Sequence, residues 1–353
     1  MRRNKEKGII LSVLIFLAGM QAFAQSVIML IPDGMSVAGT TLARFYKGEP
    51  LALDAIACGL VSTWNSDGTI ADSAPAGSAY ATGWASQTGN IASIGKSYVL
   101  PGVEIPEYEA QRPVATILEA ARLSGRSTGI ISTSEFMHAT PADFSAHDVS
   151  RSNYDNLAEQ IVYNNIDVVL GGIYEPAEAP AIRQTVSLYL GIANLTDEEV
   201  EAIGKTKAGS MNYTVGPMVG SRAKIGYTTN GHTGEDVVLY CYDPFGQRMT
   251  GLVRNSDIAL YMARTMNVDL AQATSELFQD ANSMFAKKGA KVATDTTDPE
   301  NAVLVVTKGD QVLRVPRNKS YAYLNGRAVT SDGVVVYNGT KWYVARNLLD
   351  LIE

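Results

Sequence analysis

The stretch PVATILEAARLSGRSTGIIS, residues 113–132, joins a helix directly to a strand. Its first part has apolar residues at helical spacing, a proline in the first turn and Gly125 just past the end. Its last part, STGIIS, has the length and apolar centre of a strand. A helical pattern at 153–164 and an apolar segment at 166–170 repeat the order. We therefore expect βαβ units and an α/β fold with a mostly parallel sheet sandwiched by helices.

Outside this stretch, the continuous apolar run SVIMLI, residues 26–31, predicts a strand buried on both faces. It ends at Pro32-Asp33-Gly34, which is typical of a turn. Thr196 and Glu199 form a capping box that opens a helix. Further strands are expected at 59–64 and 237–242, and further helices at 36–45, 73–82, 173–193, 255–266 and 270–284.

The sequence pattern changes from Ala302 onward. Short segments with alternating apolar and polar residues are joined there by turn sequences typical of β-hairpins. The signals are Lys308-Gly309-Asp310, Asn325-Gly326, Asp332-Gly333 and Asn338-Gly339. A closing helix is expected at 346–352. We predict a small all-β module at 296–353 after a larger α/β domain at 25–288.

The N-terminus has the pattern of a secretory signal peptide, with a basic start, an apolar run and Ala22-Phe23-Ala24 as cleavage site. An uncleaved anchor helix is the alternative. Cleavage after Ala24 predicts a periplasmic or secreted protein with no stable membrane span. It would leave 25 Lys and Arg against 35 Asp and Glu, a formal charge of −10 instead of −7. Such an acidic protein is a poor candidate for binding nucleic acid or an anionic membrane surface.

The two cysteines, Cys58 and Cys241, are too few and too far apart in sequence for a disulfide framework. Both lie in apolar, strand-like contexts, which favours two buried free thiols. A single bridge in an oxidising compartment stays open.

Two residues follow elements that would place them at a ligand site. Asp33 comes just after the first apolar run, where α/β sheets bind ligands. An Asx-turn or a helix cap is the alternative for Asp33. Ser73 begins an expected helix in ADSAPAGSAYATG, residues 71–83, whose small side chains leave its surroundings open. A serine there faces unpaired backbone N–H groups that suit an anion, although a plain N-cap explains it as well.

The three histidines fall in two clusters, with His138 and His147 in one and His232 in the other. His232 lies among small and turn-forming residues, which suits a metal ligand or a proton donor. Taken singly, each histidine is equally explained as structural. Arg151, four residues after His147, could hold a phosphate in bidentate fashion, or it could be a solvated surface residue.

Together, four motifs resemble those of the alkaline phosphatases, in order, spacing and flanking residues. They are IPDGMS, ADSAPAGSAYATG, STSEFMHATPADFSAHDVSR and TTNGHTGEDVVLY. The resemblance covers residues 26–172 and about 190–353. It implies an exported phosphomonoesterase that hydrolyses small phosphate monoesters through a phosphoserine at a site with two Zn²⁺ and one Mg²⁺. It leaves a homodimer open.

Position by position, the resemblance implies that Ser73 is the nucleophile and that Arg151 holds two phosphate oxygens. Asp33 would bridge one zinc and the magnesium, and Thr140 would bind the magnesium. His138 would stand at the neighbouring position that tunes this magnesium site. His232 would bind the zinc that activates the attacking water. Metal coordination would activate the serine hydroxyl, and two zincs would hold the attacking and leaving oxygens.

The chain departs from the family between 172 and 182, where a long segment with several metal ligands is absent. Catalytic zinc usually takes three protein ligands, and the remaining residues supply fewer. A degenerate, inactive family member is therefore the main alternative. A shortened gene and an error in the sequence record are equally consistent with this gap. A sulfatase-like hydrolase is a minor alternative. The segment Ser73-Ala74-Pro75-Ala76-Gly77 resembles the sulfatase motif C/S-x-P-x-R, but Gly77 stands where that motif needs arginine.

Overall fold

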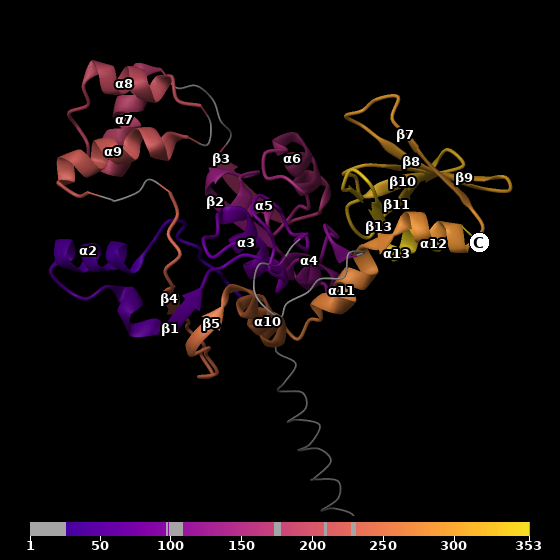
Figure 1. The fold of residues 1–353 in the computed structure, drawn as a ribbon, viewed down its shortest axis with the longest axis horizontal. Helices are drawn as coiled ribbons and strands as arrows, with labels where there is room; N and C mark the ends of the chain where they lie inside the picture. The colour runs from indigo at the N-terminus through magenta and orange to yellow at the C-terminus, as the bar shows by residue number, and fades with distance from the viewer. Residues whose placement is uncertain are drawn as a thin grey trace, which may run out of the picture.

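The computed structural model describes residues 26–96, 98, 109–172, 178–207, 210–226 and 231–352. The predicted signal peptide lies outside these residues, as does part of the expected gap at 172–182. Figure 1 shows a central α/β region, a separate group of three helices and a C-terminal β region on the opposite side. The expected combination of an α/β fold with a small antiparallel C-terminal part is confirmed.

The central region contains two short sheets. One has the order β4-β1-β5, built from Val237–Tyr240, Ala57–Ser62 and Gly251–Arg254. Within it, β1 pairs with β5 in parallel and with β4 antiparallel. The other sheet pairs β2 (Gly129–Glu135) with β3 (Val168–Gly172) in parallel, as the opening stretch predicts. Among the described residues the parallel sheet is therefore present as two separate pieces.

The helices of the central region surround these strands (Figure 1). They are α2 (Val37–Lys47), the 3₁₀ helix η1 (Ala52–Ile56), α3 (Ser73–Thr82), α4 (Ile117–Leu123), α5 (Ala139–Ala142), α6 (Tyr154–Tyr163) and α10 (Asn255–Met266). Helix α3 packs against α10 and α5. The small residues of α3 allow these close approaches, because seven of its ten residues are buried. These contacts fix the helix that begins at Ser73.

The prediction of a buried strand at 26–31 is wrong. These residues form no strand, although alternate side chains still face opposite ways. Val27 and Met29 pack against the core, whereas Ile28 and Leu30 are each 85% exposed. A strand needs a neighbour to pair its backbone groups, and among the described residues none lies alongside this segment. Its apolar residues therefore cover the core on one face alone.

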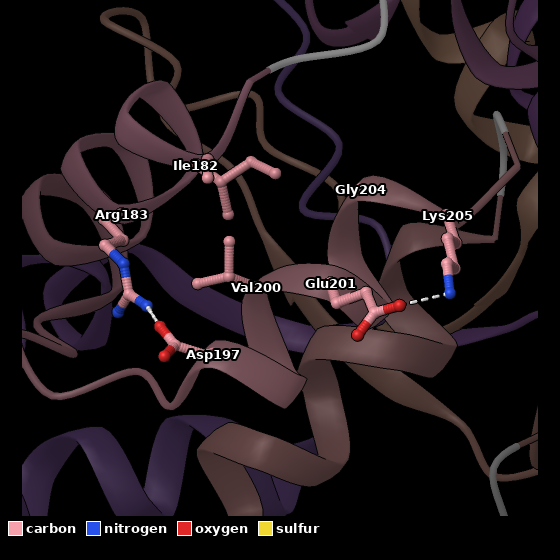
Figure 2. A pocket seen from close by; sticks show the side chains of 8 residues that line it. Ile182, Arg183, Asp197, Val200, Glu201, Gly204 and Lys205 are labelled. Carbon is pink, nitrogen blue, oxygen red and sulfur yellow. Dashed lines mark hydrogen bonds and ion pairs between the residues drawn. The ribbon is translucent and has the colours of Figure 1, made fainter.

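Three helices, α7 (Ala179–Leu190), α8 (Asp197–Gly204) and α9 (Met211–Ala223), form a separate group with its own apolar core. The Thr196 capping box opens α8 as expected. A shallow pocket lies between α7 and α8, where Ile182 and Val200 face each other (Figure 2). At its rim Arg183 pairs with Asp197, and Lys205 pairs with Glu201.

The C-terminal region is a five-stranded antiparallel sheet of order β11-β10-β9-β8-β7. Its strands are Lys291–Asp295 (β7), Val303–Lys308 (β8), Gln311–Pro316 (β9), Tyr321–Leu324 (β10) and Arg327–Thr330 (β11). The turn between β10 and β11 has positive φ at both Asn325 and Gly326, as the Asn-Gly signal predicts. This sheet packs with neighbouring helices around the fully buried Trp342.

The expected single helix at 270–284 is wrong. Helix α11 (Leu270–Leu277) ends before the short strand β6 (Gln279–Asp280), and α12 (Ala281–Lys287) follows. Strand β6 pairs with β13 (Trp342–Val344), which also pairs with β12 (Val336–Tyr337). This pairing takes Gln279 and Asp280 out of the helix, and Asp280 then caps α12. The last helix, α13, spans Arg346–Leu349.

Both cysteines are free thiols and half-buried, so the expectation of full burial is wrong. Cys58 lies in β1, and its Sγ donates to the Leu239 carbonyl oxygen of β4 at 3.5 Å. Cys241 directly follows β4, and its backbone N–H donates to the Ile56 oxygen. Partial burial raises the pKa of the Cys58 thiol. Within the described part of the chain, no helix is long and apolar enough to cross a membrane.

Candidate active site

Asp33, Ser73 and Thr140 meet although they are far apart in the sequence. Ser73 Oγ donates a hydrogen bond to Asp33 Oδ2 at 2.9 Å, and Thr140 Oγ1 donates to the same oxygen at 3.1 Å. Asp33 itself is exposed in the turn before α2, while Ser73 and Thr140 are partly buried. One carboxylate oxygen therefore joins hydroxyls from the starts of α3 and α5.

The Ser73 hydroxyl does not cap helix α3. The N-cap is Asp72, whose side chain accepts from the Ala74 backbone N–H at 3.0 Å. Ser73 is thus the first residue of the helix, and the alternative of Ser73 as a plain N-cap is wrong. The helix ends at Gly83, whose positive φ closes it. The N-terminal end of α3, with its partial positive charge, lies at the hydroxyl of Ser73.

Arg151 lies beside the same helix end. Its Nη1 is 3.3 Å from Asp72 Oδ2, and its Nη2 is 3.2 Å from His138 Nε2. A guanidinium only donates, so Nε2 of His138 accepts and the ring is neutral with its proton on Nδ1. Burial lowers the pKa of His138, and the charge of Arg151 lowers it further. The sequence alone did not indicate that Asp72 would hold Arg151.

Hydrogen bonds hold the loop that carries Arg151 in place. The Arg151 backbone N–H donates to the Gly89 oxygen at 2.7 Å. Ile91 and Asp148 exchange two backbone hydrogen bonds, at 2.9 and 3.1 Å. The Asp148 carboxylate accepts from the Ser150 backbone and from Asn153 and Asn156. Arg151 is therefore placed by ordered backbone and not by its side-chain contacts alone.

His147 is structural and not part of the exposed site. Its Nε2 lies 3.0 Å from Glu119 Oε1, and its Nδ1 lies 2.9 Å from the Ala92 carbonyl oxygen. Both side chains are completely buried. Glu119 also completes a capping box with Thr116 at the start of α4. Burial alone would raise the pKa of Glu119, but the His147 ring, the Thr116 backbone N–H and the charge of Arg122 together outweigh it, and the pKa lies below its usual value.

Among the described residues, His232 makes no direct contact with this group. It is exposed in the segment before β4, and no hydrogen bond or ion pair joins it to Asp33, Ser73 or Thr140 within the described residues. Its neighbour Gly234 lies against the Thr69 backbone, so the segment runs near the chain that leads into α3. The zinc role that the resemblance implies for His232 stays a prediction.

The oxygen atoms that meet at this site suit one cation better than the two Zn²⁺ and one Mg²⁺ that the resemblance implies. The carboxylate of Asp33 and the hydroxyl of Thr140 are hard oxygen ligands of the kind that Mg²⁺ prefers. Zinc needs nitrogen, sulfur or several carboxylates, usually three from the protein. Across the described ranges no three His, Cys, Asp or Glu side chains gather in one place. The residues therefore fit a magnesium ion and do not fit a pair of zinc ions.

A family model for alkaline phosphatase matches residues 24–186, which include Asp33, Ser73, His138, Thr140 and Arg151. The match spans less than half of the chain. It agrees with the resemblance to alkaline phosphatases that the motifs quoted from the sequence indicate. The matched residues end within α7, so α8, α9 and the C-terminal sheet lie outside the match.

Individual alkaline phosphatases agree with the family match. Alkaline phosphatase 3 of Bacillus subtilis is 36% identical over 169 residues, which cover 44% of this chain and 34% of that protein. The streptomycin-6-phosphate phosphatase of Streptomyces griseus is 32% identical over 176 residues, covering 42% and 36%. The chain thus spans about a third of the length of these relatives. A cold-active alkaline phosphatase structure from Shewanella sp. overlaps 67% of this chain and 98% of that one, at 18% identity and a TM-score of 0.49.

Proposed function

We propose that this chain acts on phosphate monoesters, with Ser73 as the nucleophile and Arg151 as the group that binds the phosphoryl oxygens. The observation that carries the proposal is the 2.9 Å hydrogen bond from Ser73 Oγ to Asp33 Oδ2. A serine hydroxyl is a weak nucleophile until an adjacent base takes its proton. Asp33 accepts the hydrogen of the Ser73 hydroxyl and is the base within reach.

In the proposed step, the Ser73 oxygen bonds to phosphorus while the bond from phosphorus to the leaving alcohol oxygen breaks. The Ser73 proton passes to Asp33, which later releases it to solvent, and the alcohol oxygen takes up a proton from solvent as it leaves. Arg151 donates to the phosphoryl oxygens with its planar fork, which suits two oxygens at once. The first turn of α3 adds its partial positive charge near the same oxygens. The product of this half-reaction is a phosphoserine at Ser73.

Metal ions enter this proposal in a limited way. Asp33 and Thr140 would hold a Mg²⁺ ion, which when bound stabilises negative charge on phosphoryl oxygens. The two-zinc arrangement expected from the family does not fit the side chains that meet at this site, so no step is assigned to zinc. His138, already occupied by Arg151, would set the surroundings of the magnesium ligands.

The substrate class follows from the same relationship. Small phosphate monoesters fit a nucleophile at an open helix end, and one relative is named for a phosphorylated antibiotic. Export to the periplasm or the medium is part of the proposal and depends on the predicted cleavage after Ala24. A homodimer belongs to the family resemblance and is likewise carried as a proposal.

The second candidate is a degenerate member that binds phosphate esters and does not turn them over. It is favoured by one observation: across the described ranges no three His, Cys, Asp or Glu side chains gather in one place. Without a metal-bound water, hydrolysis of the phosphoserine would be slow. In that case the chain would stop at the phosphoserine or at the bound ester.

The test is a turnover assay with p-nitrophenyl phosphate at alkaline pH, with zinc and magnesium supplied, on wild type and Ser73→Ala. Turnover by wild type that is lost in Ser73→Ala supports the phosphomonoesterase. An intact mass increased by one phosphoryl group, without turnover, supports the degenerate candidate. No turnover and no Ser73-dependent phosphorylation would overturn the proposal.

A further inference from the structure

Helices α3 and α5 are connected at two levels. At the upper level, Asp33 accepts from Ser73 and Thr140, the first residue of α3 and the second of α5. At the lower level, the Asp143 carboxyl reaches from the end of α5 to the next turn of α3. There its Oδ1 is 2.8 Å from Ser78 Oγ. Since Thr140 and Asp143 are three residues apart, they lie on the same face of α5.

The lower contact lies directly behind the nucleophile. Gly77 is four residues after Ser73 and therefore lies one turn below it on the same face of α3. A Cβ atom at Gly77 would come within 2.1 Å of Asp143 Oδ2, so the carboxyl is seated against the helix backbone. Only glycine leaves room for this contact.

The contacts around Ser78 favour a protonated Asp143. Ser78 Oγ lies 2.8 Å from Asp143 Oδ1, 3.2 Å from the Asn90 carbonyl oxygen and 2.8 Å from the Ala92 backbone nitrogen. The hydroxyl has one hydrogen, and the Ala92 N–H must donate to it. All three contacts are satisfied together if Ser78 donates to Asn90 and Asp143 donates to Ser78. That requires a proton on Asp143.

The surroundings of Asp143 agree with a neutral acid. The side chain is fully buried, and among the described residues its Oδ2 has no hydrogen-bond partner. An ionised carboxylate in such a place would be strongly disfavoured. The charged groups that face it are Arg151, which is already engaged by Asp72, and Asp72 itself. Burial raises the pKa of Asp143 well above its usual value.

We propose that Asp143 is a positioning residue that, as a neutral acid donating to Ser78, sets the spacing between the Ser73 and Thr140 ends of α3 and α5. The inference rests on the proposed function of Ser73. The carboxyl touches neither substrate nor reacting atoms. It acts by fixing the helix turn on which Ser73 stands, one level below the oxygen that Ser73 and Thr140 share.

The test combines one spectroscopic and one kinetic readout on the full chain. An infrared difference spectrum of wild type minus Asp143→Asn is expected to show the C=O stretch of a carboxylic acid, shifted in D₂O. Asparagine keeps the shape and can donate to Ser78, so Asp143→Asn should retain kcat within about threefold. Asp143→Ala should lower kcat about 10- to 100-fold with KM little changed, because a small misplacement costs this much. Values of kcat are referred to the folded fraction measured by near-UV circular dichroism.

The outcomes separate this inference from the proposed function. The acid band together with rescue by asparagine supports the positioning role. A carboxylate band in place of the acid band overturns it, as does an unchanged kcat in Asp143→Ala. If Asp143→Ala does not fold, Ser78→Ala removes the same hydrogen bond from the other side, and its kcat decides. If wild type shows the acid band but no turnover, the proposed function is overturned, and only the hydrogen bond between neutral Asp143 and Ser78, which joins α3 to α5, remains supported. If Asp143→Asn shows the same band, the band does not come from Asp143 and this hydrogen bond from a neutral acid is overturned as well.

Discussion

Asp72 serves two partners with its two carboxylate oxygens, capping the Ala74 backbone N–H with one and pairing with Arg151 through the other. Helix α3 and the loop that carries Arg151 are thus held by one side chain. We expect Asp72→Asn to keep the cap and lose the ion pair, since asparagine caps as well as aspartate. Asp72→Ala should lose both and cost about 1–2 kcal/mol of unfolding free energy. Urea unfolding of the two variants measures the difference, and equal losses would contradict the capping role.

The buried pair of Glu119 and His147 should dominate stability in the central region. Removing one partner of a buried pair leaves the other unpaired, so Glu119→Gln should cost about 3–5 kcal/mol. The matched control is Glu201→Gln, whose pair with Lys205 is exposed on α8 and should cost about 0–1 kcal/mol. Comparable losses in the two variants would contradict the importance of burial.

The same pair predicts a pH dependence with a defined sign. The pKa of Glu119 is lower in the folded chain than its ordinary value of 4.5. The folded state therefore holds this proton less tightly, and the stabilisation is fully present above the ordinary value. It is lost as the pH falls below 4.5. The difference in unfolding free energy between wild type and Glu119→Gln should shrink over that range, and a constant difference would exclude the linkage.

Asp143 should change the free energy of unfolding with pH in the direction opposite to Glu119. Its pKa is raised in the folded chain, so its contribution to stability is complete below the ordinary value of 3.8 and is lost as the pH rises toward the raised value. Asp143→Asn removes this loss. We expect the variant to gain stability relative to wild type as the pH increases from 4 to 9, which thermal unfolding across that range would measure. A parallel pH profile for the two proteins would be inconsistent with a buried acid.

A methyl group added at Gly77 of helix α3 should be costly. Gly77→Ala forces Cβ against the Asp143 carboxyl, and such overpacking costs about 1–3 kcal/mol. The control is Gly39→Ala on α2, where the nearest atom is Met35 Cγ at 3.9 Å. There alanine should be neutral or gain up to about 1 kcal/mol. Chemical unfolding compares the two, and a Gly77→Ala protein as stable as wild type would mean that α3 and α5 can move apart.

The sequence predicted the α/β class and most helices because their signals are local. The cap at Thr196, the Asn-Gly turn and the helix beginning at Ser73 each depend on a few neighbouring residues. The candidate residues Asp33, Ser73, Thr140, His138 and Arg151 come from motifs that are continuous in the sequence. The fold brings Ser73 and Thr140 to Asp33, and Arg151 to His138, whereas the roles of these residues stay predictions.

The wrong or missing predictions have a common physical origin, because they depend on contacts between residues that are far apart in the sequence. An apolar run such as 26–31 is a strand only if another strand pairs with it, and no local pattern reports that neighbour. The break at Gln279 and Asp280 is imposed by pairing with β13, which lies over sixty residues further along the chain. The roles of Asp72 and Asp143 were missed for the same reason, because each depends on a partner from another element.

The two kinds of sheet in this chain imply an order of events during folding. Strands β7 to β11 each pair with their immediate neighbour in sequence, so only short loops must close. The contact between Cys58 in β1 and Leu239 in β4 joins residues 181 positions apart. Closing so long a loop costs much more chain entropy. The C-terminal sheet should therefore form early, and the sheet of β4, β1 and β5 should be among the last parts of the molecule to close.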